Sequence, residues 1–464
     1  MTTDGPPLAV PPAGAAEHAR STSGAATLTG TFWTIGSQIA PFAYTMMISV
    51  FAARILGPDG MGRQSFIAFV VLSVTGICAG GFSSAVTRYI AETMGARRSA
   101  ELPRLVGWIW LIAVLLGVLG AAALIVVALL GRTPQLAWYL AAVAVFAGTL
   151  HKLVGSVLIG GRRFRVASMI SLRNGALSAV ATIVVLVLGG GISGMFAVLA
   201  VSIVSMLVMA TVQVRRMLAE EHAPPRVGLG PLPRAMVTFG LASTLPYVLK
   251  LIVAQRSEVF FLDRSSSNTQ IAFYAVAFSL IAALLAIPAA IQQVMSPTIA
   301  TLFGAGAFDR IRLAYGRALR LLLLMSVPVT AGALALGPAA IELVYGRKYR
   351  GAGTVLLVLA SSIPLIPVSG ASEALLIGYR RMRFPVVVGV VAATIDVSAA
   401  ALLVPRFDAI GAALANAAAV VAAASISLVY CVRLVGGVDL RIGSLWRMLA
   451  VSTAAALGAR GVLE

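Results

Sequence analysis

The sequence predicts an all-α polytopic integral membrane protein, and three observations lead to this fold class. Of the 464 residues, 59% are hydrophobic and only 11% are charged, whereas soluble domains carry roughly a quarter charged residues. Charge-poor apolar runs of about 20 residues recur along the whole chain, and each is long enough to cross a hydrocarbon core of about 30 Å. Lysine and arginine stand mainly between these runs, as expected of loops that connect membrane spans.

Twelve apolar spans are expected, with boundaries good to a few residues. They lie at about 27–53, 64–87, 105–130, 136–160, 166–188, 194–214, 235–255, 271–294, 318–340, 352–377, 384–404 and 409–432. A partial thirteenth, Met448 to Gly458, is too short to span and is expected at the membrane interface. Residues 1–26 are rich in Pro, Ala and Gly and are expected to be disordered, without the pattern of a signal peptide.

The loops on the two sides of the predicted bundle differ in charge. Alternate segments, starting with the N-terminal tail, hold 23 lysines and arginines, and the opposite loops hold nine. The positive-inside rule therefore places both termini and the arginine-rich loops in the cytoplasm. The turn "GRRFR" at 161–165 is then cytoplasmic, and its charge mainly sets the topology.

Several other classes of protein are disfavoured. The net charge of +19 does not indicate nucleic-acid binding, because the arginines punctuate apolar runs and form no single patch. The two cysteines and three histidines match neither a disulfide nor a metal-ligand spacing. "GGGISG" at 189–194 lacks the preceding strand of a dinucleotide-binding motif, and no nucleotide-binding lysine loop occurs. We therefore expect no catalytic residues, no metal and no cofactor, and the short loops count against an enzyme.

Internal similarity indicates a duplication. "LIGGRRFR" at 158–165 is similar to "LLIGYRRMRF" at 375–384, and Gly161 and Gly378 are 217 residues apart. Gly194 and Gly411, in a second pair of similar segments, show the same offset. Six spans in each half would make the halves parallel repeats about an axis along the membrane normal. The predicted divisions are the N-tail 1–26, a six-helix bundle 27–214, a cytoplasmic linker 215–234, a second six-helix bundle 235–432 and a cytoplasmic or interfacial C-tail 433–464.

Two prolines lie at similar places in the first and seventh spans. Pro41 in "SQIAPFAYT" and Pro246 in "ASTLPYVLK" are hinge candidates, because interrupted spans at matching positions of two halves often flank a transport site. Ordinary proline kinks of membrane helices are the alternative.

Ionisable residues inside spans are functional candidates, because each costs at least a few kcal/mol there. Lys152 and Arg173 lie roughly 10 Å deep on either side of the 161–165 turn, and Lys250 lies deeper, about 15 residues into its span. Asp396 is expected near the midplane, as a counter-ion for Lys250 or Arg173 or as a proton or sodium site, and Glu258 joins it if the seventh span continues. The alternatives are snorkelling for the cations and a purely structural ion pair for Asp396. Cations in excess suit an anionic head group better than a drug cation.

The chain also resembles the polysaccharide-transporter (Wzx-type) flippases of the multidrug/oligosaccharidyl-lipid/polysaccharide (MOP) superfamily. The similar segments, spread over about residues 27–432, are "AARILGPDGMGRQS", "AVTRYIAE", "RRFRVASMI", "LVYGRKYRGAG" and "VPRFDAIGAALANAAA". The resemblance implies two six-helix bundles around a central cavity that move a polyprenyl-diphosphate-linked oligosaccharide to the outer leaflet of a bacterial plasma membrane.

The resemblance also implies site residues and partners. Basic residues facing the cavity are thought to contact the diphosphate, and by position these are Arg54, Arg88, Lys250 and Arg256. Partners would be the lipid-linked oligosaccharide, membrane lipids and other glycan-assembly proteins, with no nucleic acid. Ala272 and Asp408 depart from the family pattern, which usually has glycine at these places, and members often have fourteen spans.

Three functions stay open at this point. The leading one is a flippase for a lipid-linked oligosaccharide, a precursor of cell-surface polysaccharide or lipopolysaccharide. A cation-coupled small-molecule exporter of the multidrug type is the second, and a non-transporting membrane scaffold of a glycan-assembly complex is the third.

Overall fold

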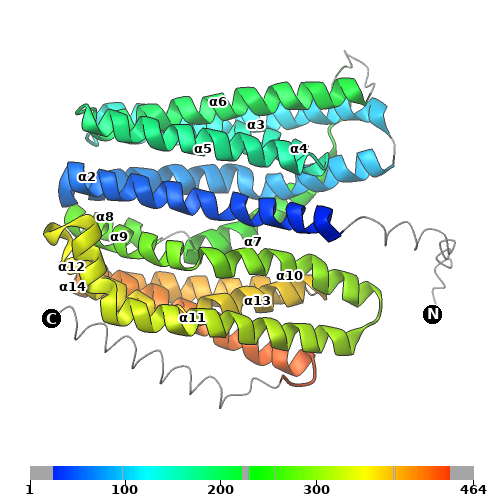
Figure 1. The fold of residues 1–464 in the computed structure, drawn as a ribbon. Coiled ribbons are helices and arrows are strands. Elements are labelled where there is room, and N and C mark those ends of the chain that lie inside the picture. Colours follow the sequence, from blue (N-terminus) through cyan, green and yellow to red (C-terminus); the bar gives the residue numbers. More distant parts are fainter. Residues whose placement is uncertain are drawn as a thin grey trace.

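The computed structural model is a bundle of helices (Figure 1). It describes residues 24–96, 98–221, 228, 230–254, 257–379, 381 and 383–438, and within this part of the chain there is no strand. The all-helical fold class is therefore confirmed. The first 23 residues of the predicted N-tail and the partial thirteenth span lie outside the described residues.

Helices α2 to α6 come from the first half of the chain. Their bounds are α2 Gly24–Gly95, α3 Leu102–Leu129, α4 Gln135–Gly160, α5 Phe164–Val187 and α6 Gly191–Glu220, with a short 3-10 helix at Ser99–Glu101. The second half forms α7 Arg234–Ala254, α8 Glu258–Ser265, α9 Asn268–Leu284, α10 Ala286–Gly304, α11 Phe308–Tyr345, α12 Gly351–Ala360, α13 Leu365–Gly378 and α14 Arg383–Leu434, with a 3-10 helix at Arg347–Tyr349.

Two of these helices each contain a backbone break. In α2 the break is at Gly57, with φ 68° and ψ 178°, and in α14 it is at Asp408, with φ 49° and ψ −130°. At 1.5 Å per residue a straight helix of 50 residues would be about 75 Å long, more than twice the hydrocarbon core. Figure 1 shows α2 folding back on itself, so that it supplies length for two spans.

Seven helices among the described residues are long and apolar enough to cross a membrane, or eight if α12 and α13, bent by 43°, form one span. The chain is thus a multi-pass membrane protein. Because α2 and α14 are each counted once, this number does not test the predicted twelve spans, which stay a prediction together with the division into two bundles.

Small residues let helices from the two halves approach closely. A Cβ atom added at Gly80 of α2 would collide with the ring of Tyr247 in α7, and one at Gly62 would collide with the backbone of Asn268 at the start of α9. Such small-residue contacts drive helix association in membranes, where apolar burial alone contributes little. Helix α2 therefore packs against α7 and α9 as well as against α4.

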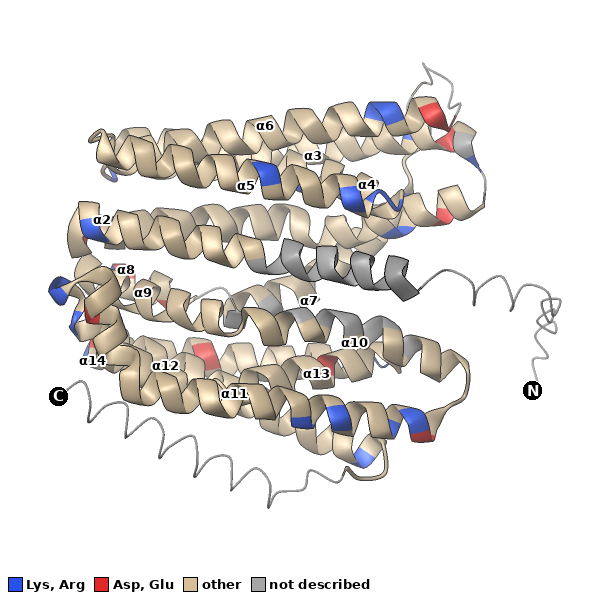
Figure 2. Ribbon diagram, viewed as in Figure 1, with Lys and Arg blue, Asp and Glu red and all other residues tan. Residues whose placement is uncertain are grey.

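The two ends of the bundle differ in charge, as the sequence predicts (Figure 2). We call the end with the turns at 96–101, 161–163 and 305–307 the arginine-rich end, and the end with Gly57 and the α3–α4 turn the arginine-poor end. Gly161 follows α4 and Gly378 ends α13, so the two similar turns both lie at the arginine-rich end.

Candidate functional site

Lys152 lies in the contact between the two halves. Its Nζ donates a hydrogen bond of 2.8 Å to the hydroxyl of Tyr247 in α7 and lies 4.7 Å from the centroid of the same ring. The side chain is half-buried in the middle part of α4. Cation–π attraction strengthens this contact where water is scarce. The arrangement places a positive charge within a helix that is long and apolar enough to cross a membrane, hydrogen-bonded to a helix of the opposite half.

Hydroxyl groups continue this polar strip toward the arginine-rich end. Ser83 and Ser156 share a hydrogen bond of 2.7 Å, and Ser156 also donates to the carbonyl of Lys152. Thr87 donates to the carbonyl of Ser83. The strip between α2 and α4 offers hydrogen-bonding groups beside the lysine, and hydropathy alone does not reveal it.

Arg173 and Arg88 are more exposed than Lys152. Arg173 lies on an exposed face of α5, and among the described residues it makes no hydrogen bond or ion pair, so the structure does not join it to Lys152 or Asp396. Arg88 pairs with Glu92 at 2.8 Å one turn along α2, and its guanidinium lies 4.8 Å from the ring of Phe239 in α7. Arg88 therefore lies at the contact between halves near the arginine-rich end.

Arg54 lies at the opposite, arginine-poor end. Its Nε and Nη2 donate 2.7 Å hydrogen bonds to the carbonyls of Val344 and Leu343, in the last turn of α11. Orphan carbonyls at a helix C-terminus attract cations. In this conformation the guanidinium caps a helix of the second half, so a diphosphate ligand would have to compete with these carbonyls.

Further polar contacts join the halves at the arginine-poor end. The hydroxyl of Tyr349 donates to the carbonyl of Ala53 at 2.9 Å, and Asn268 donates to Asp59 at 2.8 Å. Arg132 of the α3–α4 turn pairs with Asp263 of α8 at 2.7 Å, which raises the pKa of Arg132 through a side-chain hydrogen bond. We call these contacts, with that of Arg54, the arginine-poor-end ties. They hold the halves together on that side.

Lys250 and Arg256, the two remaining cation candidates, are not tested by the structure. The side chain of Lys250 and the whole of Arg256 lie outside the described residues. Both stay predictions.

A buried acidic cluster lies where α8 begins. The side chains of Glu258 and Asp396 are fully buried and interact with each other. Ser257 donates to Asp396 Oδ2 at 2.7 Å, and Asn416 donates to Glu258 Oε1 at 2.9 Å. The other two oxygens, Glu258 Oε2 and Asp396 Oδ1, lack a hydrogen-bond partner among the described residues. Two facing carboxylates repel each other, so this arrangement suits a shared proton or a bound cation.

The sequence singled out Glu258 and Asp396 but not Asn416, Ser257 or Tyr247. Asn416 follows Asp396 by 20 residues on the other side of the break in α14, and no periodicity relates the two. Their juxtaposition depends on the chain reversal at Asp408. An uncharged polar residue in an apolar run is the one sequence signal that points to Asn416.

The predicted hinge prolines lie inside continuous helices. Pro41 lies within α2, 16 residues before its break at Gly57, and Pro246 lies within α7. Their role as hinges stays a prediction.

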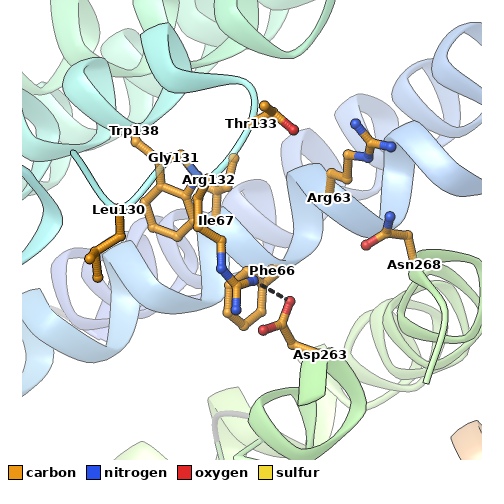
Figure 3. Close-up of a pocket in the computed structure, with 10 residues that line it drawn as sticks. All are labelled: Arg63, Phe66, Ile67, Leu130, Gly131, Arg132, Thr133, Trp138, Asp263 and Asn268. Carbon is orange, nitrogen blue, oxygen red and sulfur yellow. Dashed lines mark hydrogen bonds and ion pairs between the residues drawn. The ribbon is translucent and has the colours of Figure 1, made fainter. Parts of the chain in front are cut away.

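A cavity of about 460 Å³ opens at the arginine-poor end, between the halves (Figure 3). Its walls come from α2, the α3–α4 turn, α4, α8 and the start of α9. No residue singled out from the sequence lines it.

Comparison with known proteins gives a family and a fold. The family model described as polysaccharide biosynthesis protein matches residues 51–354. No curated protein sequence matches the chain. An inward-facing multidrug resistance MATE family transporter of the MOP superfamily superposes with a TM-score of 0.71 at 14% identity, covering 90% of this chain and 99% of that one.

Two further structures have the same fold. The lipid II flippase MurJ, in an inward closed conformation, has a TM-score of 0.72 at 14% identity, covering 93% of this chain and 92% of that one. A MOP superfamily transporter from Pyrococcus furiosus has a TM-score of 0.64 at 14% identity, covering 88% and 94%. At these identities the similarity is one of fold, and together with the family model it confirms the resemblance predicted from the sequence.

Proposed function

The chain belongs to the polysaccharide biosynthesis protein family and has the MOP superfamily fold, and on this premise we propose that it is a flippase for a polyprenyl-diphosphate-linked oligosaccharide. The protein would move this precursor from the inner to the outer leaflet of a bacterial plasma membrane by alternating access. Both termini would be cytoplasmic, which makes the arginine-rich end the side of loading. Its function is transport, with no chemical conversion of the substrate.

The observation that carries the proposal is the position of Lys152. A half-buried ammonium in the apolar part of α4 is costly unless something offsets its charge. The Tyr247 hydroxyl and ring offset part of that cost, and a diphosphate entering between the halves would offset more. A buried cation attracts a phosphate strongly, because the surrounding hydrocarbon screens the charges weakly. Lys152 is accordingly the first contact that we assign to the diphosphate, with Arg88 beside the route from the arginine-rich end.

The arginine-poor-end ties support the same direction of transport. Arg54, Tyr349 and Arg132 each join the halves at that end. A carrier closed there loads from the arginine-rich side, where the lipid-linked precursor is made. Arg54 and the other ties must break before the substrate leaves, so we assign Arg54 to the closure of the exit.

The Glu258–Asp396 cluster is the proposed coupling site. A proton or monovalent cation held between the two carboxyls would neutralise them, and its loss would drive them apart. The cluster joins α8 to both segments of α14 through Asp396 and Asn416. Occupancy of this site therefore acts on the packing of three helical segments in the second half.

The second candidate function is a cation-coupled exporter of small molecules. The acidic cluster and the fold shared with a MATE transporter favour it. Lys152 disfavours it for cationic substrates, because an ammonium in the pathway repels them. The two functions differ in the ligand that is expected to bind at Lys152. A non-transporting scaffold would need no charge at Lys152 or Asp396.

The test uses purified protein in proteoliposomes that contain a fluorescent polyprenyl-diphosphate disaccharide. Lys152→Gln is expected to reduce the flipping rate at least about tenfold, as expected for loss of one charged contact, and Lys152→Arg to retain part of it. Arg98→Gln, which removes an exposed arginine paired with Glu101, is the control and is expected to flip at the normal rate. Asp396→Asn tests coupling, and its flipping should lose dependence on a proton or sodium gradient.

Two results would reject the proposal. Normal flipping by Lys152→Gln would show that the lysine only snorkels. Wild-type protein that moves no lipid-linked glycan but exports a small molecule against its gradient would establish the second function.

A further inference from the structure

The cavity at the arginine-poor end combines charge, hydrogen-bonding groups and an aromatic wall. Arg63 lies on one side with Thr133 and Asn268, and Arg132 lies beside Asp263 (Figure 3). The volume of about 460 Å³ lies within the range of small-molecule sites, roughly 300 to 1,000 Å³. It has room for a sugar ring, and the groups around it can hydrogen-bond to ring hydroxyls.

Arg132 is held in place yet accessible to a ligand. The ring of Phe66 lies 5.3 Å from its guanidinium, and this ring in turn packs edge-on against Trp138 with 6.0 Å between centroids. The bond to Asp263 uses Nη1 of a group that has five N–H donors. Because the side chain of Arg132 is 48% exposed, the rest of the fork is open to the cavity.

The arginines lining the cavity can bind a singly charged carboxylate. Each of the two guanidinium groups is paired with one carboxylate, Arg132 with Asp263 and Arg63 with Asp59, and each keeps further N–H donors that its ion pair does not use. The planar guanidinium fork matches a carboxylate, and Asp263 already accepts one hydrogen bond from Arg132 through Nη1. A doubly charged phosphate would meet stronger repulsion from Asp263 than a carboxylate would.

We propose that this cavity is an exit-side subsite for an acidic sugar, a sugar ring bearing one carboxylate, within the exported glycan. The source of the sugar rests on the proposed function, whereas the binding site stands on the geometry of the cavity. The sugar carboxylate takes the place of Asp263 on Arg132, while Arg63, Thr133 and Asn268 contact its hydroxyls. Binding then breaks one of the arginine-poor-end ties and favours opening at that end.

The experiment measures binding of free D-glucuronate and of D-glucose, its neutral analogue, to the purified full-length protein in lipid nanodiscs by calorimetry or ligand-observed NMR. We expect saturable glucuronate binding with Kd around the millimolar range, and glucose at least about tenfold weaker. Arg132→Gln and Arg63→Gln should weaken glucuronate by about tenfold to a hundredfold and leave glucose unchanged.

Asp263→Asn gives the decisive variant. It removes the competing carboxylate and should tighten glucuronate binding several-fold, a gain that a misfolded protein cannot show. Arg98→Gln, at the far end of the bundle, is the control with unchanged affinity. The proposal is overturned by equal binding of glucose and glucuronate, by no binding of either, or by weaker binding in Asp263→Asn. Inhibition by inorganic phosphate or acetate as strong as that by glucuronate would show a simple anion site instead.

A parallel measurement separates this proposal from the proposed function. Flipping of a polyprenyl-diphosphate glycan without acidic sugars is followed in proteoliposomes with wild-type protein. If the wild-type protein does not flip this glycan, the proposed flippase function is rejected, and the result on glucuronate binding is unaffected. Flipping without glucuronate binding would keep the flippase and reject the subsite.

Discussion

Replacing Arg54 by glutamine should shift the protein toward states that are open at the arginine-poor end. Arg54 donates two hydrogen bonds of 2.7 Å from α2 to the last turn of α11. These bonds join the two halves only while that end is closed. Glutamine is shorter and uncharged, so it cannot span both carbonyls or complement the negative end of α11.

The size of the shift follows from the two bonds. A charge-assisted hydrogen bond contributes about 1.5 to 3 kcal/mol when shielded, and exposure of Arg54 reduces this to about 1 kcal/mol each. A loss of about 2 kcal/mol corresponds to roughly a 30-fold change in the equilibrium between closed and open states. An open state populated at about 1% would rise to about 20%.

Distances between spin labels measure this population. Gly189 in the α5–α6 turn and Lys348 after α11 lie on different halves at the arginine-poor end and suit labelling in a background where Cys78 and Cys431 are alanine. Arg54→Gln should add a longer-distance component that Arg98→Gln lacks. An unchanged distance distribution in a folded Arg54→Gln protein would refute the reasoning, and loss of substrate binding without that component would restore Arg54 as a diphosphate ligand.

Three further outcomes are expected. A cysteine at position 163 should resist an impermeant thiol reagent in intact cells while one at position 131 is labelled, and the reverse pattern would invert the predicted topology. Flipping in proteoliposomes should proceed without ATP and respond to an imposed potential, which acts with about 2.3 kcal/mol per charge per 100 mV, so that a strict ATP requirement would contradict it. Asp408→Gly should raise the thermal midpoint by relieving about 1 to 2 kcal/mol of strain at φ 49°, and a lower midpoint would show that the aspartate side chain compensates.

The helices and their ends were largely predictable, because hydropathy and charge are local properties of the sequence. The break at Gly57 falls between the first two predicted spans, and the break at Asp408 between the last two. Glycine before proline suits the positive φ at Gly57. Asp408 stands where the family usually has glycine, and its positive φ gives the physical reason for that usage.

The partners of the candidate residues were less predictable, because they depend on contacts between distant helices. The partners of Arg54 are main-chain carbonyls about 290 positions away. Every residue has a main-chain carbonyl, so the sequence does not indicate which of them will accept a hydrogen bond from Arg54. Depth in a span singled out Asp396 as a counter-ion or as a proton or sodium site, but it did not show that Ser257 and Glu258 are its neighbours in the structure. The cavity lined by Arg63 and Arg132 was missed because its residues come from five segments that are each unremarkable alone.

Helix α7 connects the two parts of the proposed mechanism. Tyr247 on α7 holds Lys152, and ten residues later Ser257 bonds to Asp396 beside Glu258. Helix α7 continues for seven residues past Tyr247 to Ala254, about 10 Å at 1.5 Å per residue, and Ser257 follows three positions later, so a change in the acidic cluster has a short route to the lysine. Tyr247→Phe keeps the ring but removes the hydroxyl. We expect it to bind the diphosphate as before, while flipping loses its dependence on a proton or sodium gradient.

The control for this prediction is Tyr89→Phe on α2, which keeps a ring beside Phe239 of α7 but lies away from Lys152. It should flip with the normal gradient dependence. If Tyr247→Phe also retains that dependence, the route from the acidic cluster to the substrate does not pass through the tyrosine hydroxyl. If Tyr247→Phe instead loses diphosphate binding, the hydroxyl itself contacts the diphosphate and orients Lys152. It then does not couple Lys152 to the acidic cluster.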